Sequence, residues 1–63
     1  MKHQFKVPGL SADSADKVKD VILTAEPDAS VAVDLEQQII TVETEASDES
    51  IRQLIVSVGQ EVA

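Results

Sequence analysis

Two segments of this chain repeat one spacing of aliphatic residues, and this repeat limits the folds that the chain can adopt. Residues at positions i, i+3, i+4 and i+7 lie on one face of a helix, so each segment predicts an amphipathic helix with a single face to bury. The first set is Val18, Val21, Ile22 and Ala25. The second set is Ile51, Leu54, Ile55 and Val58.

Segments in which apolar and polar residues alternate flank both predicted helices. A period of two is typical of a strand with one buried and one wet face, and it predicts strands over residues 3–7, 30–35 and 39–44. The side chains expected on the core face are His3, Phe5, Val7, Val31, Val33, Leu35, Ile40 and Val42. A final edge strand is expected over residues 60–62.

The order of these elements is βαββαβ, which is two half-length units with the same helix pattern. That order fits the split βαβ arrangement. We therefore predict an α+β fold, a ferredoxin-like βαββαβ sandwich in which a four-stranded antiparallel sheet carries two helices on one face. With 63 residues, the chain is expected to form a single domain over residues 1–63.

Local signals predict where the helices begin and end. Either Ser11 or Asp13 can cap the first helix and Ser47 can cap the second, because a side-chain oxygen accepts from a free N–H of the first turn. Pro27 ends the first helix, since it drives the residue before it out of helical geometry. Gly59 is expected directly after the second helix, where a left-handed residue is common.

Composition excludes several partners and chemistries. The 12 acidic and 5 basic residues give a net charge of −7, which repels nucleic acid, and a single Phe with no Trp or Tyr leaves no aromatic platform for bases. The lack of cysteine excludes disulfides and zinc–thiolate sites. No apolar run reaches the length of a membrane span and no signal peptide is recognisable, so we expect a cytoplasmic protein without a membrane partner.

The chain resembles the heavy-metal-associated domain, the module of copper chaperones and of the N-terminal repeats of metal-pumping P-type ATPases. The resemblance covers nearly the whole sequence, and the matching segments are 5–7, 8–9, 26–35, 40–43 and 58–59. It implies the same ferredoxin-like fold. In that family the loop after the first strand reads Gly-Met-x-Cys-x-x-Cys, and its two thiolates hold a soft metal ion.

The metal-binding residues of the family are replaced here. The two cysteine positions align with Ala12 and Ala15, the methionine position aligns with Leu10, and the aromatic position after the late glycine aligns with Gln60. Soft cations such as Cu(I) select sulfur ligands, so we expect no soft metal and no cofactor at this site. We call this segment the vestigial loop; its residues are Leu10, Ser11, Ala12, Asp13, Ser14 and Ala15.

Oxygen and nitrogen ligands near the loop are few. Asp13, Asp16 and His3 are the weak alternative ligands, and a hard cation normally takes six or more oxygens. Helix capping accounts equally well for all four oxygen-bearing residues of this segment, Ser11, Asp13, Ser14 and Asp16. With one His, no Cys and no glycine-rich phosphate loop, the sequence also lacks the groups of a nucleophilic or phosphoryl-transfer enzyme, so we expect no catalytic residues.

Three interpretations follow from these residues. The first is a degenerate heavy-metal-associated domain that acts through another protein, bound at the vestigial loop or at a sheet edge, as a monomer or weak homodimer. The alternative is a metal-ion binding or transport protein that uses oxygen or His ligands. The third is an engineered chain with Cys→Ala changes; the further changes at Leu10 and Gln60 count against it, and the sequence leaves it open.

Overall fold

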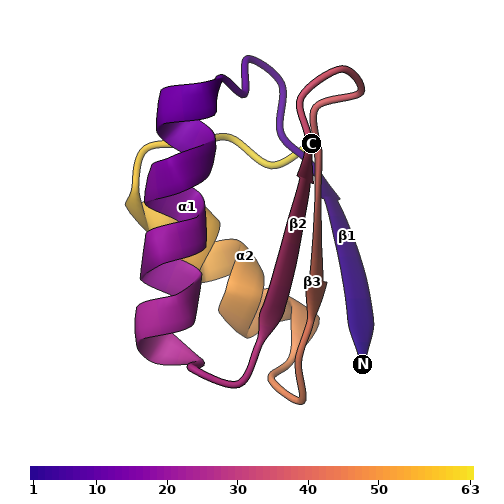
Figure 1. The fold of residues 1–63 in the computed structure, drawn as a ribbon, viewed down its shortest axis with the longest axis vertical. Coiled ribbons are helices and arrows are strands. Elements are labelled where there is room, and N and C mark those ends of the chain that lie inside the picture. Colours follow the sequence, from indigo (N-terminus) through magenta and orange to yellow (C-terminus); the bar gives the residue numbers. More distant parts are fainter.

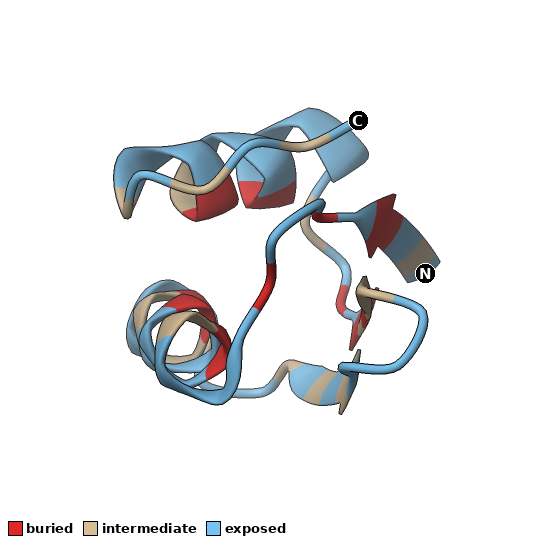
Figure 2. Ribbon diagram, turned by 90° about the horizontal axis from the view of Figure 1, so that it is seen from above, coloured by how far each residue is buried: buried red, intermediate tan, exposed pale blue.

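The computed structural model describes all 63 residues of the chain. Its elements are β1 (Lys2–Lys6), α1 (Ala12–Ala25), β2 (Ser30–Asp34), β3 (Ile39–Glu43) and α2 (Asp48–Ser57). The three strands form one antiparallel sheet in the order β1-β3-β2, and both helices cover the same face of it (Figures 1 and 2). The predicted α+β, ferredoxin-like arrangement with two helices on one face is therefore confirmed.

The prediction of a fourth strand is wrong. The sheet has three strands, and residues 60–62 form no regular element. This last segment runs back toward the end of β1, where the Ala63 N–H donates to the Lys6 carbonyl oxygen at 2.9 Å (Figure 1). A strand requires a repeated ladder of such bonds, and this single bond does not make one.

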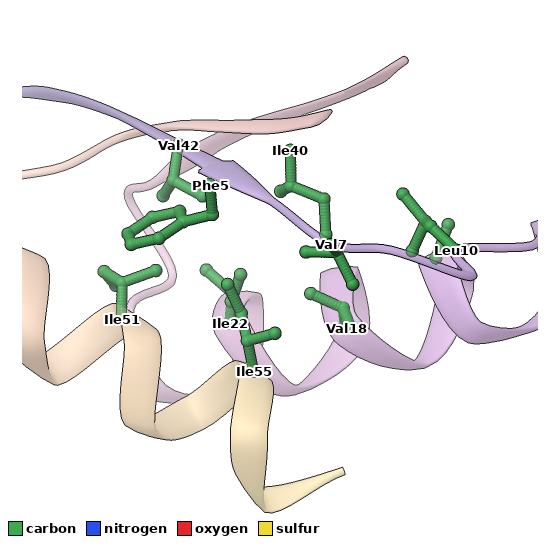
Figure 3. Close-up of a cluster of buried hydrophobic side chains, with 10 residues drawn as sticks. Phe5, Val7, Leu10, Val18, Ile22, Ile40, Val42, Ile51 and Ile55 are labelled. Carbon is green, nitrogen blue, oxygen red and sulfur yellow. The ribbon is translucent and has the colours of Figure 1, made fainter. Parts of the chain in front are cut away.

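The core lies between the sheet and the helices. Seven side chains are less than 2% exposed and come from every layer of the fold; they are Ile22, Ile40, Ile51, Ile55, Val7, Val18 and Val42 (Figure 3). The predicted inward faces of α2, of β1 and of β3 are confirmed, and that of α1 is confirmed at Val18, Val21 and Ile22. Ala25 was predicted on the same face of α1 but is exposed at the end of the helix, so its predicted place in the core is wrong. Leu35 is an exception: it follows the end of β2 and is 44% exposed, so its predicted place on the core face is wrong.

Both helices begin and end at the residues that the sequence predicts. Ser11 caps α1 and Ser47 caps α2, each accepting a hydrogen bond from the N–H three residues later. Helix α1 ends at Ala25, and Gly59, with φ 87°, follows the C-cap of α2. Neither helix has the length and apolarity that crossing a membrane requires.

A four-residue loop joins β2 to β3. The Asp34 Oδ1 atom accepts from the Gln37 N–H at 3.1 Å, and Gln38 takes a positive φ of 59°. That conformation suits Gly or Asn, so its occurrence at a glutamine is unusual. The backbone oxygen of Gln38 accepts from the Val7 N–H at 2.8 Å, and this bond ties the loop to the end of β1.

Candidate functional site

The vestigial loop lies between the end of β1 and the first turn of α1. Its Leu10 is only 6% exposed and extends the core beside Val7 and Val18 (Figure 3). Ala12 is exposed at the first position of α1, whereas Ala15 lies one turn later and is 6% exposed. The side chains at both family ligand positions are methyl groups, and a methyl group has no lone pair to offer a metal ion.

The two serines of the loop bond to each other. The Ser14 N–H donates to Ser11 Oγ at 3.3 Å, and the Ser11 N–H donates to Ser14 Oγ at 2.9 Å. This reciprocal pair is a capping box, which satisfies two N–H groups that the helix itself leaves unbonded. The predicted capping role is thus confirmed for Ser11 and Ser14, while Asp13 lies within the first turn.

Replacing the capping serine is expected to weaken the fold without touching the core. For Ser11→Ala we expect a loss of about 1 kcal/mol in the free energy of unfolding, because the Ser14 N–H loses its acceptor. Urea denaturation monitored by circular dichroism measures this loss. Ser57→Ala is the matched control, because Ser57 is the last residue of α2 and its Oγ only donates to the Leu54 carbonyl oxygen. Equal losses in both variants would contradict the capping role.

The weak alternative ligands are not gathered in one place. Asp13 and Asp16 are exposed on α1 and make no side-chain hydrogen bond or ion pair. His3 lies at the start of β1, at the end of the sheet opposite the vestigial loop (Figure 1). No three His, Asp or Glu side chains are close enough together to hold a metal ion.

His3 has a structural environment of its own. Its ring is 10% exposed, its Nε2 lies 3.1 Å from the Ala46 carbonyl oxygen, and its Nδ1 lies 3.7 Å from Asp48 Oδ1. A carbonyl oxygen only accepts, so Nε2 is the donor. His3 therefore links the first strand to the start of α2, where Asp48 also pairs with Arg52 at 3.3 Å.

A groove between α1 and β2 is the feature that sequence reasoning missed. It has a volume of about 240 Å³ and is lined by five apolar residues, Ala12, Ala15, Val31, Val33 and Leu35, together with Asp16 and Lys19. We call it the α1–β2 groove. It joins the vestigial loop to the edge of the sheet at β2, two surfaces that lie apart in the sequence. The sequence does indicate the helical side of this groove, because residues 12, 15, 16 and 19 have the i, i+3, i+4, i+7 spacing of one helix face.

Comparisons with known proteins agree with this architecture. Residues 4–61 match the family model described as the heavy-metal-associated domain. No curated protein matches the chain significantly.

Solved structures, two copper chaperones among them, share the fold over almost their full length. Copper chaperone Atx1 from Synechocystis PCC6803 in its Cu2 form is 29% identical, with 97% of this chain and 98% of that chain covered and a TM-score of 0.90. The cyanobacterial copper metallochaperone ScAtx1 is 30% identical, with 100% of both chains covered and a TM-score of 0.84. Apo-CopP from Helicobacter pylori is 28% identical, with 100% of both chains covered and a TM-score of 0.80.

Proposed function

The chain belongs to the heavy-metal-associated domain family, and from this premise we propose that it is a degenerate member that acts through contacts with another protein. One observation carries the proposal: the chain matches the family over residues 4–61, while both ligand positions, Ala12 and Ala15, carry methyl groups. The donor set therefore does not fit a soft metal ion, which requires sulfur ligands. Leu10 at the methionine position removes the remaining thioether.

The contact surface in this proposal is the vestigial loop with the adjoining α1–β2 groove. Five of the seven residues that line the groove are apolar, and an apolar recess on a small acidic domain is suited to take up side chains of a partner. In this proposal the protein is cytoplasmic, is a monomer or weak homodimer, and catalyses no reaction. The alternative of oxygen or His ligands has no observation in its favour, since His3 lies far along the sheet from Asp13 and Asp16.

Titration with Cu(I) under reducing conditions tests the loss of the metal site. The native chain competes with a coloured Cu(I) chelator whose affinity is micromolar. We expect the chelator to keep its copper at every protein concentration, because the vestigial loop supplies no thiolate. Removal of one equivalent of copper from the chelator would overturn the proposal.

Amide shifts in the presence of Zn(II) or Ni(II) test the alternative ligands. We expect no change at residues 9–16 when either metal is added to the native chain. A change there that disappears in Asp13→Ala would favour the metal-binding alternative instead. Ser57→Ala serves as the matched control, because it alters an exposed helical side chain outside this loop.

A further inference from the structure

Hydrogen bonds between β1 and β3 fix which way the backbone groups of the sheet point. The Val7 N–H donates to the Gln38 oxygen at 2.8 Å, and the Thr44 N–H donates to the Met1 oxygen at 2.9 Å. Bonding pairs in an antiparallel ladder recur at every second residue. The even-numbered residues of β3 therefore direct their backbone groups toward β1, and its odd-numbered residues direct theirs toward β2.

The same alternation leaves two residues of β2 with unpaired backbone groups. The odd-numbered residues of β3 pair with Ser30, Ala32 and Asp34. Val31 and Val33 alternate with these, so their N–H and C=O groups point away from the sheet. These four groups form an open hydrogen-bonding edge, while the opposite edge at β1 receives a bond from Ala63 to Lys6.

This edge has no lysine, proline or bulge, three of the devices that usually prevent a strand from pairing with another chain. Natural edges carry Lys, Pro or a bulge, or they are covered by another segment. β2 reads Ser-Val-Ala-Val-Asp, and its five residues pair with β3 without a bulge. An edge of this kind can accept one further strand.

The α1–β2 groove lies directly beside the open edge. Val31 and Val33 supply the unpaired backbone groups and also line the groove, with Ala12 and Ala15 opposite them on α1. Figure 2 shows α1 running alongside β2 on the helical side of the sheet. At about 240 Å³ the groove is smaller than the roughly 300 Å³ at which small-molecule sites begin, and it suits one or two side chains of an added strand.

Charge decides between the occupants of this edge. Asp34 is the last residue of β2, Asp28 precedes the strand by two positions, Glu36 follows in the loop, and Asp16 borders the groove. Two cations lie near these four acids: Lys19 lines the groove, and Lys2 lines a recess together with Ser30 and Ala32. A second copy would bring the same acidic edge and a further net charge of −7, so the two copies would repel each other. A basic segment is attracted instead.

We propose that β2 receives an extended, basic segment of a partner protein as a fourth strand, with apolar side chains of that segment entering the α1–β2 groove. The main-chain bonds to Val31 and Val33 hold the segment, and the groove together with the acidic surroundings selects it. This inference rests on the proposed function, because it names the surface and the partner chemistry for a domain that acts through protein contacts.

A pair of synthetic peptides tests the inference. The probe is a seven-residue peptide of alternating Val and Thr with Lys at both ends; its twin has Glu at both ends. When the Lys peptide is added to the ¹⁵N-labelled chain at low salt, we expect the amide signals of residues 30–34, 12 and 15 to shift. We expect the Lys peptide to bind at least about tenfold more tightly than its twin. Salt should reduce this preference. No shift at residues 30–34 at millimolar peptide, or equal binding of the twin, would overturn the inference.

Two variants separate the edge from the groove. Val33→Pro removes an outward N–H without removing a ladder bond, and Val33→Thr is its control because it keeps the N–H and the branched shape. Ala12→Leu fills the groove and leaves the backbone intact, with Ala25→Leu as control at the exposed end of α1. We expect Val33→Pro and Ala12→Leu to weaken peptide binding at least fivefold (about 1 kcal/mol) and the controls to leave it unchanged. Circular dichroism establishes that each variant is folded.

The failures of the two proposals are distinguishable. Peptide binding that is unchanged in Ala12→Leu would overturn the strand-addition inference and leave the Cu(I) result untouched. Copper capture by the native chain would overturn the proposed function, whatever the peptides do. Dimerisation of the chain alone, detected by sedimentation and abolished by Val33→Pro, would identify a second copy as the occupant and overturn the basic partner.

Discussion

The double variant Ala12→Cys/Ala15→Cys is expected to bind one Cu(I) at least about a thousandfold more tightly than the native chain, because paired thiolates match a soft cation and methyl groups do not. Ala12 is the first residue of α1 and Ala15 lies three residues later, so the two side chains are neighbours on the helix surface. The positive end of the helix dipole also favours thiolates there. Competition with a Cu(I) chelator measures the gain.

Two controls isolate the contribution of sulfur. Ala12→Ser/Ala15→Ser adds atoms of similar size at the same positions without a soft ligand, and it should bind no more Cu(I) than the native chain. Ala12→Cys alone supplies one thiolate and should fall well short of the pair. A double-cysteine variant that leaves copper on the chelator would contradict the expectation; it would show that Leu10 and Gln60 have altered the site beyond its two ligands.

Truncating Ile22 is expected to remove most of the stability of the domain. Its side chain is 0% exposed in the centre of the core, and Ile→Ala at such a site costs about 2–5 kcal/mol. Single-core domains of this size rarely have more than about 3–5 kcal/mol in total. Ile22→Ala should therefore lower the Tm by at least about 10 °C or leave the chain unfolded at room temperature, as thermal melts by circular dichroism would record.

Milder substitutions at the same and other positions complete this test. Ile22→Val keeps the branched shape and should cost about 1 kcal/mol. Val56→Ala, at a helical side chain that is 52% exposed, should change stability by less than about 0.5 kcal/mol. A loss in Val56→Ala as large as that in Ile22→Ala would contradict the assignment of the core.

Features that depend on near neighbours in the sequence were predictable from it. The caps at Ser11 and Ser47 and the end of α1 at Ala25 agree with the structure, and so do the helix faces except at Ala25, which is exposed. Each depends on residues within one or two turns, whose spacing and hydrogen-bonding groups are visible in the sequence. The positive φ of Gln38 carried no such signal, because glutamine rarely takes that conformation.

Errors arose where a distant part of the chain sets the outcome. Residues 60–62 were expected to form a strand, but only the single bond from Ala63 to Lys6 joins this end of the chain to β1. Leu35 fitted the alternation of β2, yet the strand ends at Asp34, and Leu35 is 44% exposed and lines the α1–β2 groove instead of the core. The weak alternative ligands lie on different elements, His3 in β1 and Asp13 and Asp16 in α1, which the sequence alone does not place relative to one another.

The sequence by itself determined the class of fold and the loss of thiolates at Ala12 and Ala15, since both follow from residue type and local spacing. Only the tertiary structure decided that these alanines lie across a groove from Val31 and Val33, and that β2 is the edge whose backbone groups remain unpaired. The physical reason is that strand order and helix–sheet packing join residues far apart in the chain. The spacing of side chains along the sequence indicates which face is buried, and does not indicate which strand lies at the edge of the sheet.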